Sequence, residues 1–177
     1  MNFIPNQPSK ALSVPYYEDV TGDDGWQGQR TEKSVDRLKS EVVEGVTRLG
    51  GFVSGFTMGT FQIDGLERQG CQVFYSITAN NGRFVPGRLD IAALPVRDKY
   101  SSTKKDKALR MALFMLRDAL NGMWFFQQLS PGYAPLMPFM IGNSEGKTIS
   151  QLWAESPVMN NLLPPGDAEF IEAEVEE

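Results

Sequence analysis

Two short turn motifs, Asp64-Gly65 and Asn80-Asn81-Gly82, constrain the fold of this chain more than any other feature. They separate three segments of strand-like composition, residues 52–63, 66–79 and 83–96. Asp-Gly and Asn-Gly are the strongest short-range hairpin signals, because these residues tolerate the positive φ of tight turns. The three segments are therefore predicted to form an antiparallel meander.

The middle strand shows the two-residue period of a half-buried strand. One face carries Cys71, Val73, Tyr75 and Ile77, and the other carries Gln72, Ser76 and Thr78 together with Phe74. The flanking strands contain Gly55, Gly59 and Pro86-Gly87. Proline cannot donate to a strand ladder, so bulges or edge positions are expected at these places, and the third strand is predicted at an edge.

A helix is predicted over Thr31–Leu49, before the first strand. Apolar residues recur there at spacings of three and four, at Val35, Leu38, Val42, Val46 and Leu49. The glycine pair at 50 and 51 then ends the helical pattern. Its other face mixes basic and acidic side chains, as a solvated, ion-paired surface does.

A longer helix is predicted from Lys104 to Leu129, with Thr103 to Asp106 as its [ST]-x-x-[DE] start. This helix is apolar nearly all round, so one sheet face cannot cover it. Either the proline-rich segment 130–141 or a second subunit is expected to cover the rest. The predicted fold class is α+β, a three-stranded antiparallel meander packed against the amphipathic N-terminal helix and the long hydrophobic helix.

The length of 177 residues suits one domain with tails. Residues 1–30, rich in proline and glycine, are predicted to form an extended N-terminal arm. Its aromatic residues are expected to dock, either on this fold or on a neighbouring subunit. Residues 31–163 are predicted to form a single α+β domain. Residues 164–177 hold six acidic residues and no basic one, which indicates a disordered acidic tail.

Composition excludes several classes of protein. The chain has no histidine, which removes Ser-His-Asp systems, histidine bases and zinc sites that use imidazole. It has one cysteine and no secretory signal, so a cytoplasmic location is expected. No run of 18 apolar residues exists, so no membrane span is expected. We predict no enzyme activity, no cofactor and no metal site.

Weaker motifs favour structural roles. Gly142 to Thr148 reads GNSEGKT, with three residues between the glycines where a phosphate-binding loop has four. We interpret it as a turn that caps a short helix over 148–155. The carboxylates of Asp64, Asp90 and Glu145 are candidate magnesium ligands, but no two are placed together by sequence. Asp90 is better explained as an ion-pair partner of Arg88.

A basic segment carries the functional prediction. Residues 83–117 hold nine basic and three acidic residues, and their middle part opens the long helix, whose free N–H groups favour anions. The predicted nucleic-acid-binding residues are Arg83, Arg88, Arg97, Lys99, Lys104, Lys105, Lys107 and Arg110. Lysines, hydroxyl groups and a helix start suit phosphate oxygens. The alternative is that a strand-to-helix loop is polar in any case.

The order helix, three antiparallel strands, helix resembles the layout of the double-stranded-RNA-binding domain, which also has lysines at the start of its last helix. The meander followed by a long helix is similar to the single-strand-annealing recombinases, whose basic hairpins and helices form rings on DNA. Neither likeness rests on a specific motif, so no family is assigned. Both likenesses imply nucleic-acid binding.

The sequence therefore predicts a non-enzymatic nucleic-acid-binding accessory protein, including the case of a single-strand-specific homo-oligomer that binds DNA or RNA. The acidic tail would recruit a protein partner or compete for the basic surface. The alternative is a structural or assembly protein that self-associates through the long apolar helix and has no nucleic-acid role.

Overall fold

The structure is a computed structural model that describes residues 14–156. The larger elements are α1 (Val35–Arg48), β1 (Gly51–Ile63), β2 (Leu66–Thr78), β3 (Phe84–Ala92), α2 (Ser102–Leu129) and α3 (Ile149–Glu155). Three short 3-10 helices are η1 (Tyr17–Asp19), η2 (Gly22–Asp24) and η3 (Met137–Phe139). The predicted α+β class is confirmed. The predicted acidic tail lies outside the described residues.

The sheet is the predicted antiparallel meander in the order β1-β2-β3. Both hairpins turn at the expected motifs, and Asp64 takes the positive φ of 51° that such a turn needs. The register shifts between Val53 and Gly55, which confirms a bulge at that glycine. β3 is an edge strand as predicted, but it ends at Ala92 instead of 96. Ala93 still donates to the Gln69 carbonyl over 2.7 Å, and the chain then leaves the sheet at Leu94, which is buried against the arm.

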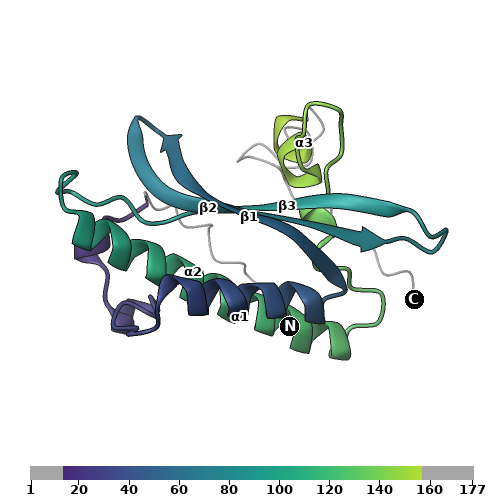
Figure 1. The fold of residues 1–177 in the computed structure, drawn as a ribbon, viewed down its shortest axis with the longest axis horizontal. Coiled ribbons are helices and arrows are strands. Elements are labelled where there is room, and N and C mark those ends of the chain that lie inside the picture. The colour runs from purple at the N-terminus through teal and green to yellow at the C-terminus, as the bar shows by residue number, and fades with distance from the viewer. Residues whose placement is uncertain (1–13, 157–177) are drawn as a thin grey trace, which may run out of the picture.

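Helices α1 and α2 lie together under one face of the sheet, and α3 lies on the opposite side (Figure 1). The main core between the helices and the sheet includes Leu38, Val42, Val46, Cys71, Val73, Tyr75, Leu89, Leu113 and Leu120, together with Leu136 from the proline-rich segment. The Tyr75 hydroxyl donates to the Leu136 carbonyl over 2.9 Å. The proline-rich segment therefore closes one end of this core, but it leaves Phe125, Phe126 and Leu129 of α2 exposed.

Side-chain caps set the helix starts. The Ser34 hydroxyl accepts the Arg37 N–H at 3.2 Å, so α1 begins four residues later than predicted. The Ser101 hydroxyl accepts the Lys104 N–H at 3.3 Å, so the prediction of Thr103 as the cap of α2 is wrong. Ser101 takes that role because its backbone is extended, whereas Thr103 is already helical. α2 ends at Leu129, as predicted.

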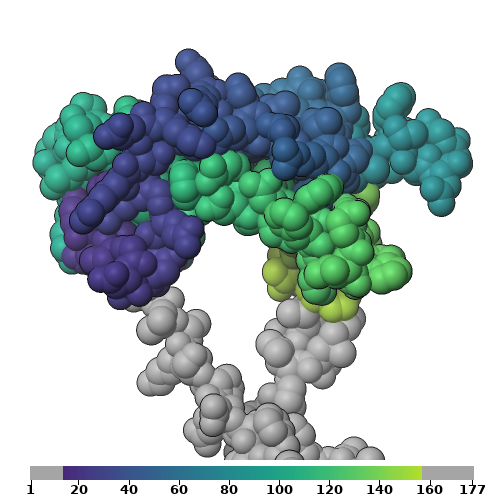
Figure 2. Space-filling model, turned by 90° about the horizontal axis from the view of Figure 1, so that it is seen from below, coloured from purple at the N-terminus to yellow at the C-terminus, as the bar shows by residue number. Residues whose placement is uncertain are grey.

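The described part of the arm, residues 14–30, packs on its own fold. Tyr17 and Val20 are buried against Leu94 and Met111, with Trp26 beside them. The Tyr17 N–H donates to the Pro95 carbonyl over 2.9 Å. Figure 2 shows the molecule hollowed below α2, between the arm and the segment that contains η3 and α3. The arm is therefore one wall of a concave surface.

Candidate functional site

The predicted basic residues do not form one site, because the structure separates them along the sheet. Arg83 lies at the β2–β3 turn, whereas Arg97 to Arg110 lie at the other end of β3, in the connection to α2 and its first turns (Figure 1). β3 has nine residues, so about 30 Å of strand separates the two groups. Any phosphate contacts at the two ends would belong to different parts of a bound chain.

Three cations at the start of α2 are held by acidic residues from other elements. The Arg97 guanidinium pairs with both Asp19 oxygens, each at 2.5 Å. Lys104 lies 3.4 Å from Glu18, and Lys105 lies 3.1 Å from Glu67. Burial disfavours the charged form of Glu18, but the backbone N–H of Arg97 and the Lys104 ammonium outweigh it, so the pKa of Glu18 is lowered.

Arg88 connects α3 to the sheet. Its guanidinium lies 2.8 Å from Asp90 and donates to the Gly146 carbonyl over 3.0 Å. The predicted Arg88–Asp90 pair is thus confirmed, and Gln72 also donates to Asp90. This half-buried network serves to hold the loop before α3.

Arg110 pairs with Asp106 one turn earlier in α2. The predicted residues without an ion pair to any described residue are Arg83, Lys99 and Lys107. Four acidic side chains from other elements, Glu18, Asp19, Glu41 and Glu67, face cations of residues 83–117. When these four acidic side chains are counted, the charge excess of six within residues 83–117 falls to two.

The face of the sheet away from α1 and α2 gathers three phenylalanines. Phe84 pairs with Thr78, Phe52 pairs with Ser76, and Phe74 lies next along β2 on the same face. Phe52 is 70% exposed and Phe84 is 74% exposed, while Phe74 is half-buried. Sequence reasoning missed this group, although the position of Phe74 among polar alternating residues was the available indication.

Arg83 directly precedes Phe84 at the β2–β3 turn, where its carbonyl accepts the Ala79 N–H, so strand alternation directs its side chain away from the face that carries Phe84. Its side chain is exposed, and its backbone N–H donates to the Asn81 side chain over 3.1 Å, which fixes the turn. This part of the face also carries the hydroxyl residues Ser54, Ser76 and Thr78, with Pro86 opposite Ser76 and Arg88 opposite Phe74. We call Phe52, Phe74 and Phe84 the aromatic face. It offers flat π surfaces and hydroxyl groups, which suit stacked bases, and Arg83 supplies a cation at the adjoining turn.

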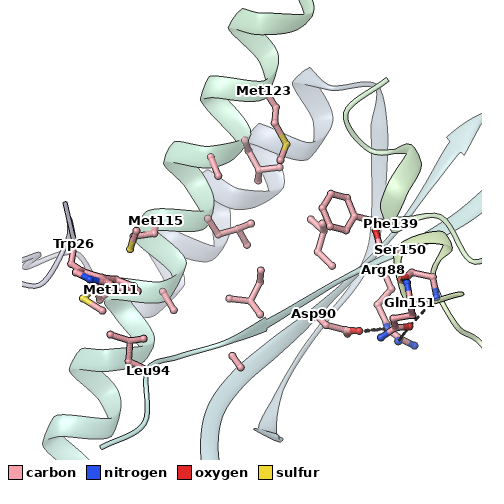
Figure 3. A pocket seen from close by; sticks show the side chains of 18 residues that line it. Trp26, Arg88, Asp90, Leu94, Met111, Met115, Met123, Phe139, Ser150 and Gln151 are labelled. Atoms are coloured by element: carbon pink, nitrogen blue, oxygen red, sulfur yellow. Dashed lines mark hydrogen bonds and ion pairs between the residues drawn. The ribbon is translucent and has the colours of Figure 1, made fainter. Parts of the chain in front are cut away.

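A second concave site lies along the edge of β3, below α2. It is a groove of about 560 Å³ with mostly apolar walls. Met111, Met115 and Met123 enter it from α2, Trp26 closes one end, and Phe139 lies near the other (Figure 3). Three methionines give such a wall an adaptable apolar surface.

The polar end of this groove is formed by the Arg88–Asp90 pair and by Ser150 and Gln151 of α3 (Figure 3). Arg88 and Gln151 approach to 3.4 Å, so the cation is already engaged. This end therefore offers hydrogen-bonding groups but no spare charge. The groove suits an apolar chain or ligand with a few polar atoms.

The GNSEGKT loop is the predicted turn. The Asn143 side-chain oxygen accepts the N–H groups of Glu145 and Lys147, and the buried Thr148 caps α3. The Lys147 ammonium pairs with Glu155 at 2.6 Å, which raises the pKa of Lys147. These hydrogen bonds and this ion pair already occupy backbone N–H groups and the lysine ammonium, which are the groups that a phosphate-binding loop would use to hold a phosphate.

Cys71 lies in the core, and its pKa is raised to about 11 by burial. Among residues 14–156 no cluster of three acidic or cysteine side chains could hold a metal ion. None of the helices in this range is long and apolar enough to cross a membrane. No protein family, curated protein or solved structure matches the chain. The site must therefore be interpreted from its own geometry.

Proposed function

We propose that this protein binds single-stranded nucleic acid without catalysing a reaction, and that the aromatic face is its primary contact. The observation that carries the proposal is the pair of exposed rings, Phe52 and Phe84, on one sheet face. Arg83, which has no ion pair to a described residue, adds an exposed cation at the adjoining β2–β3 turn. Open antiparallel sheets with exposed aromatic residues stack unpaired bases, and base stacking tolerates any sequence.

The register allows one strand of nucleic acid to contact both rings. Phe52 and Phe84 lie on the two outer strands, opposite Ser76 and Thr78 of β2. Their positions are offset by about 7 Å along the strands and by about 10 Å across them, because the two outer strands are two strand spacings apart. The two rings would therefore stack on two different bases of the same strand. Lys99 and Lys107, far along the molecule, would contact the backbone of a longer strand.

The first test replaces rings. Phe52→Ala and Phe84→Ala should each weaken binding to a 20-nucleotide single strand by about 1–3 kcal/mol, about 5- to 150-fold, because a stacked base is lost. Trp153→Ala is the matched control, since Trp153 is 51% exposed on α3 and belongs neither to the aromatic face nor to the apolar end of α2. Fluorescence anisotropy measures the affinities. Equal affinities for all four proteins, or no binding by the wild-type chain at low salt, would refute the proposal.

The second test separates partnered from unpartnered cations. Arg83→Gln should reduce the slope of log affinity against log salt by about 0.7, the value for one phosphate contact on a single strand. Arg97→Gln should change it less, because Asp19 already neutralises Arg97. A larger effect of Arg97 would place the phosphate site at the start of α2 instead.

Assembly through α2 is a second candidate function, and one observation favours it. The last turns of α2 expose Phe125, Phe126 and Leu129, at 62%, 52% and 80%, and Met137 nearby is 50% exposed. Exposed apolar side chains grouped in this way mark interaction surfaces. We propose that this patch joins copies of the chain.

Sedimentation across a range of dilutions tests the assembly candidate. The wild-type chain should sediment as more than a monomer of 19.7 kDa at micromolar concentration. Leu129→Gln with Phe125→Gln should lower the mass toward that value. A wild-type monomer at every concentration would exclude assembly, and nucleic-acid binding can be measured independently on the same samples.

A further inference from the structure

The chain itself contains an apolar segment that can cover the groove between β3 and α2. We propose that residues 157–163, with the sequence PVMNNLL, lie in this groove as an extended segment in the same molecule. This inference does not depend on nucleic-acid binding, because the groove and the aromatic face use different residues apart from their common strand, β3.

The groove is an incomplete part of the fold. β3 is an edge strand, and Met140 and Ile141 pair only with its Pro86–Gly87 stretch. Beyond Gly87, no other described residue adds a strand to this edge. An edge that keeps free backbone groups beside an apolar wall is the geometry at which an extended segment adds a strand.

The residues of α2 that line the groove recur at helical spacing. Ala112, Met115, Ala119 and Met123 follow one another at intervals of three and four and all line the groove. Ala119 is exposed, and Met115 and Met123 are only half-buried. This stripe is the part of α2 that the sheet does not cover. The nearly all-round apolar character of the helix is therefore explained if another apolar segment covers the stripe.

The position of the chain end argues for residues 157–163. The described chain stops at Ser156, directly after α3, and Ser150 and Gln151 of α3 line the groove. The following segment holds Val158, Met159, Leu162 and Leu163, whereas the chain beyond 164 carries the six acidic residues. The apolar part of this terminus is thus the part attached next to the groove.

The lengths also agree. From Met111 to Met123 the helix rises about 18 Å, at 1.5 Å per residue. Seven extended residues span at most about 25 Å. The segment is therefore long enough to follow most of this wall, and Asn160 and Asn161 would supply polar groups for the strand edge or for the Ser150–Gln151 end.

Two truncations test the proposal with a matched control. Removal of residues 157–177 should lower the melting temperature by roughly 5 °C, since two or more buried apolar side chains are lost. The same variant should bind the apolar dye anilinonaphthalene sulfonate. Removal of residues 164–177 alone should change neither measurement. If both truncations behave alike, or if the longer one is as stable and as dye-free as the full chain, the proposal is wrong.

Disulfide trapping in the full chain distinguishes this occupant from a second copy. The native Cys71 is buried and its raised pKa keeps it unreactive, so introduced cysteines report alone. Ala119→Cys with Leu162→Cys should oxidise to a cross-linked monomer, and so should Ala119→Cys with Leu163→Cys. Ala119→Cys with Val175→Cys is the control, expected to cross-link several-fold more slowly. Cross-linked dimers from the first two pairs would assign the groove to a second copy, and equal rates at position 175 would overturn the proposal.

Discussion

The two faces of the sheet use aromatic side chains in opposite ways. On the helix-covered face, Tyr75 is 2% exposed and its ring passes over Gly87 to reach the Leu136 carbonyl. On the other face, Phe52 and Phe84 are 70% and 74% exposed. Both faces belong to the same three strands, so backbone preference does not account for the difference. The face covered by α1 and α2 holds the fold together, whereas the other face leaves the rings of Phe52 and Phe84 exposed to solvent.

The largest expected effect compares one aromatic residue from each face. Tyr75→Ala should destabilise the protein by about 3–5 kcal/mol, because it empties a core site and leaves the Leu136 carbonyl without its donor. Phe84→Ala should change stability by less than about 0.5 kcal/mol, since the ring is mostly in water. Urea unfolding of both variants measures this. A comparable loss for Phe84 would show that the open face is covered in solution.

A pair of glycine substitutions gives a smaller and more local comparison. A Cβ at Gly87 would lie 2.3 Å from the Tyr75 ring, so Gly87→Ala should cost about 1–3 kcal/mol through forced repacking. A Cβ at Gly59 meets nothing within 4 Å, so Gly59→Ala should be neutral or stabilise by about 0.5 kcal/mol. Thermal unfolding of both variants measures the two effects. If Gly87→Ala is tolerated as well as Gly59→Ala, the position of the Tyr75 ring is wrong.

The covered half of the molecule was predictable from sequence because its determinants are local. Hairpin motifs, alternation in β2 and the period of α1 each act within a few residues, and they set the topology correctly. The start of α2 was misplaced because Ser101 and Thr103 are both plausible caps, and backbone conformation decides between them. β3 ended early for a non-local reason, since the arm draws Leu94 out of the sheet.

The candidate sites were less predictable because they depend on contacts between distant residues. A count of lysines and arginines cannot show that Asp19 faces Arg97 or that Glu67 faces Lys105, at separations of 78 and 38 residues. The aromatic face was missed for a similar reason. Phe52 and Phe84 become neighbours only through the register of three strands, although Phe74 on the polar side of β2 indicated that this face is unusual.

The smallest expected effect concerns the ion pairs between α1 and α2. It measures how much these charges, rather than apolar burial, contribute to holding the two helices together. Glu41 of α1 accepts from Lys33 at 2.6 Å and lies 3.3 Å from Arg117 of α2. The hydrogen bond from Lys33, with the nearby arginines, outweighs burial and lowers the pKa of Glu41. Because the pKa of Glu41 is lower in the folded chain than in the unfolded chain, the unfolded chain binds this proton at a higher pH. The stabilisation by ionised Glu41 is therefore present above about pH 4.5 and is lost as the pH falls below it. With the carboxylate 21% exposed, it should stay below about 1 kcal/mol.

Urea unfolding of the wild type and Glu41→Gln between pH 7 and pH 3 measures this contribution. The difference in unfolding free energy should be nearly constant down to about pH 5 and should then shrink, because protonated Glu41 resembles glutamine. Glu32→Gln is the control, since Glu32 is exposed and has no ion pair to a described residue. A difference of several kcal/mol at pH 7 would show that the Glu41 cluster holds α1 on α2 as strongly as the core does. Part of the stability that we attribute to apolar burial beneath the sheet would then come from the ion pairs of Glu41 with Lys33 and Arg117.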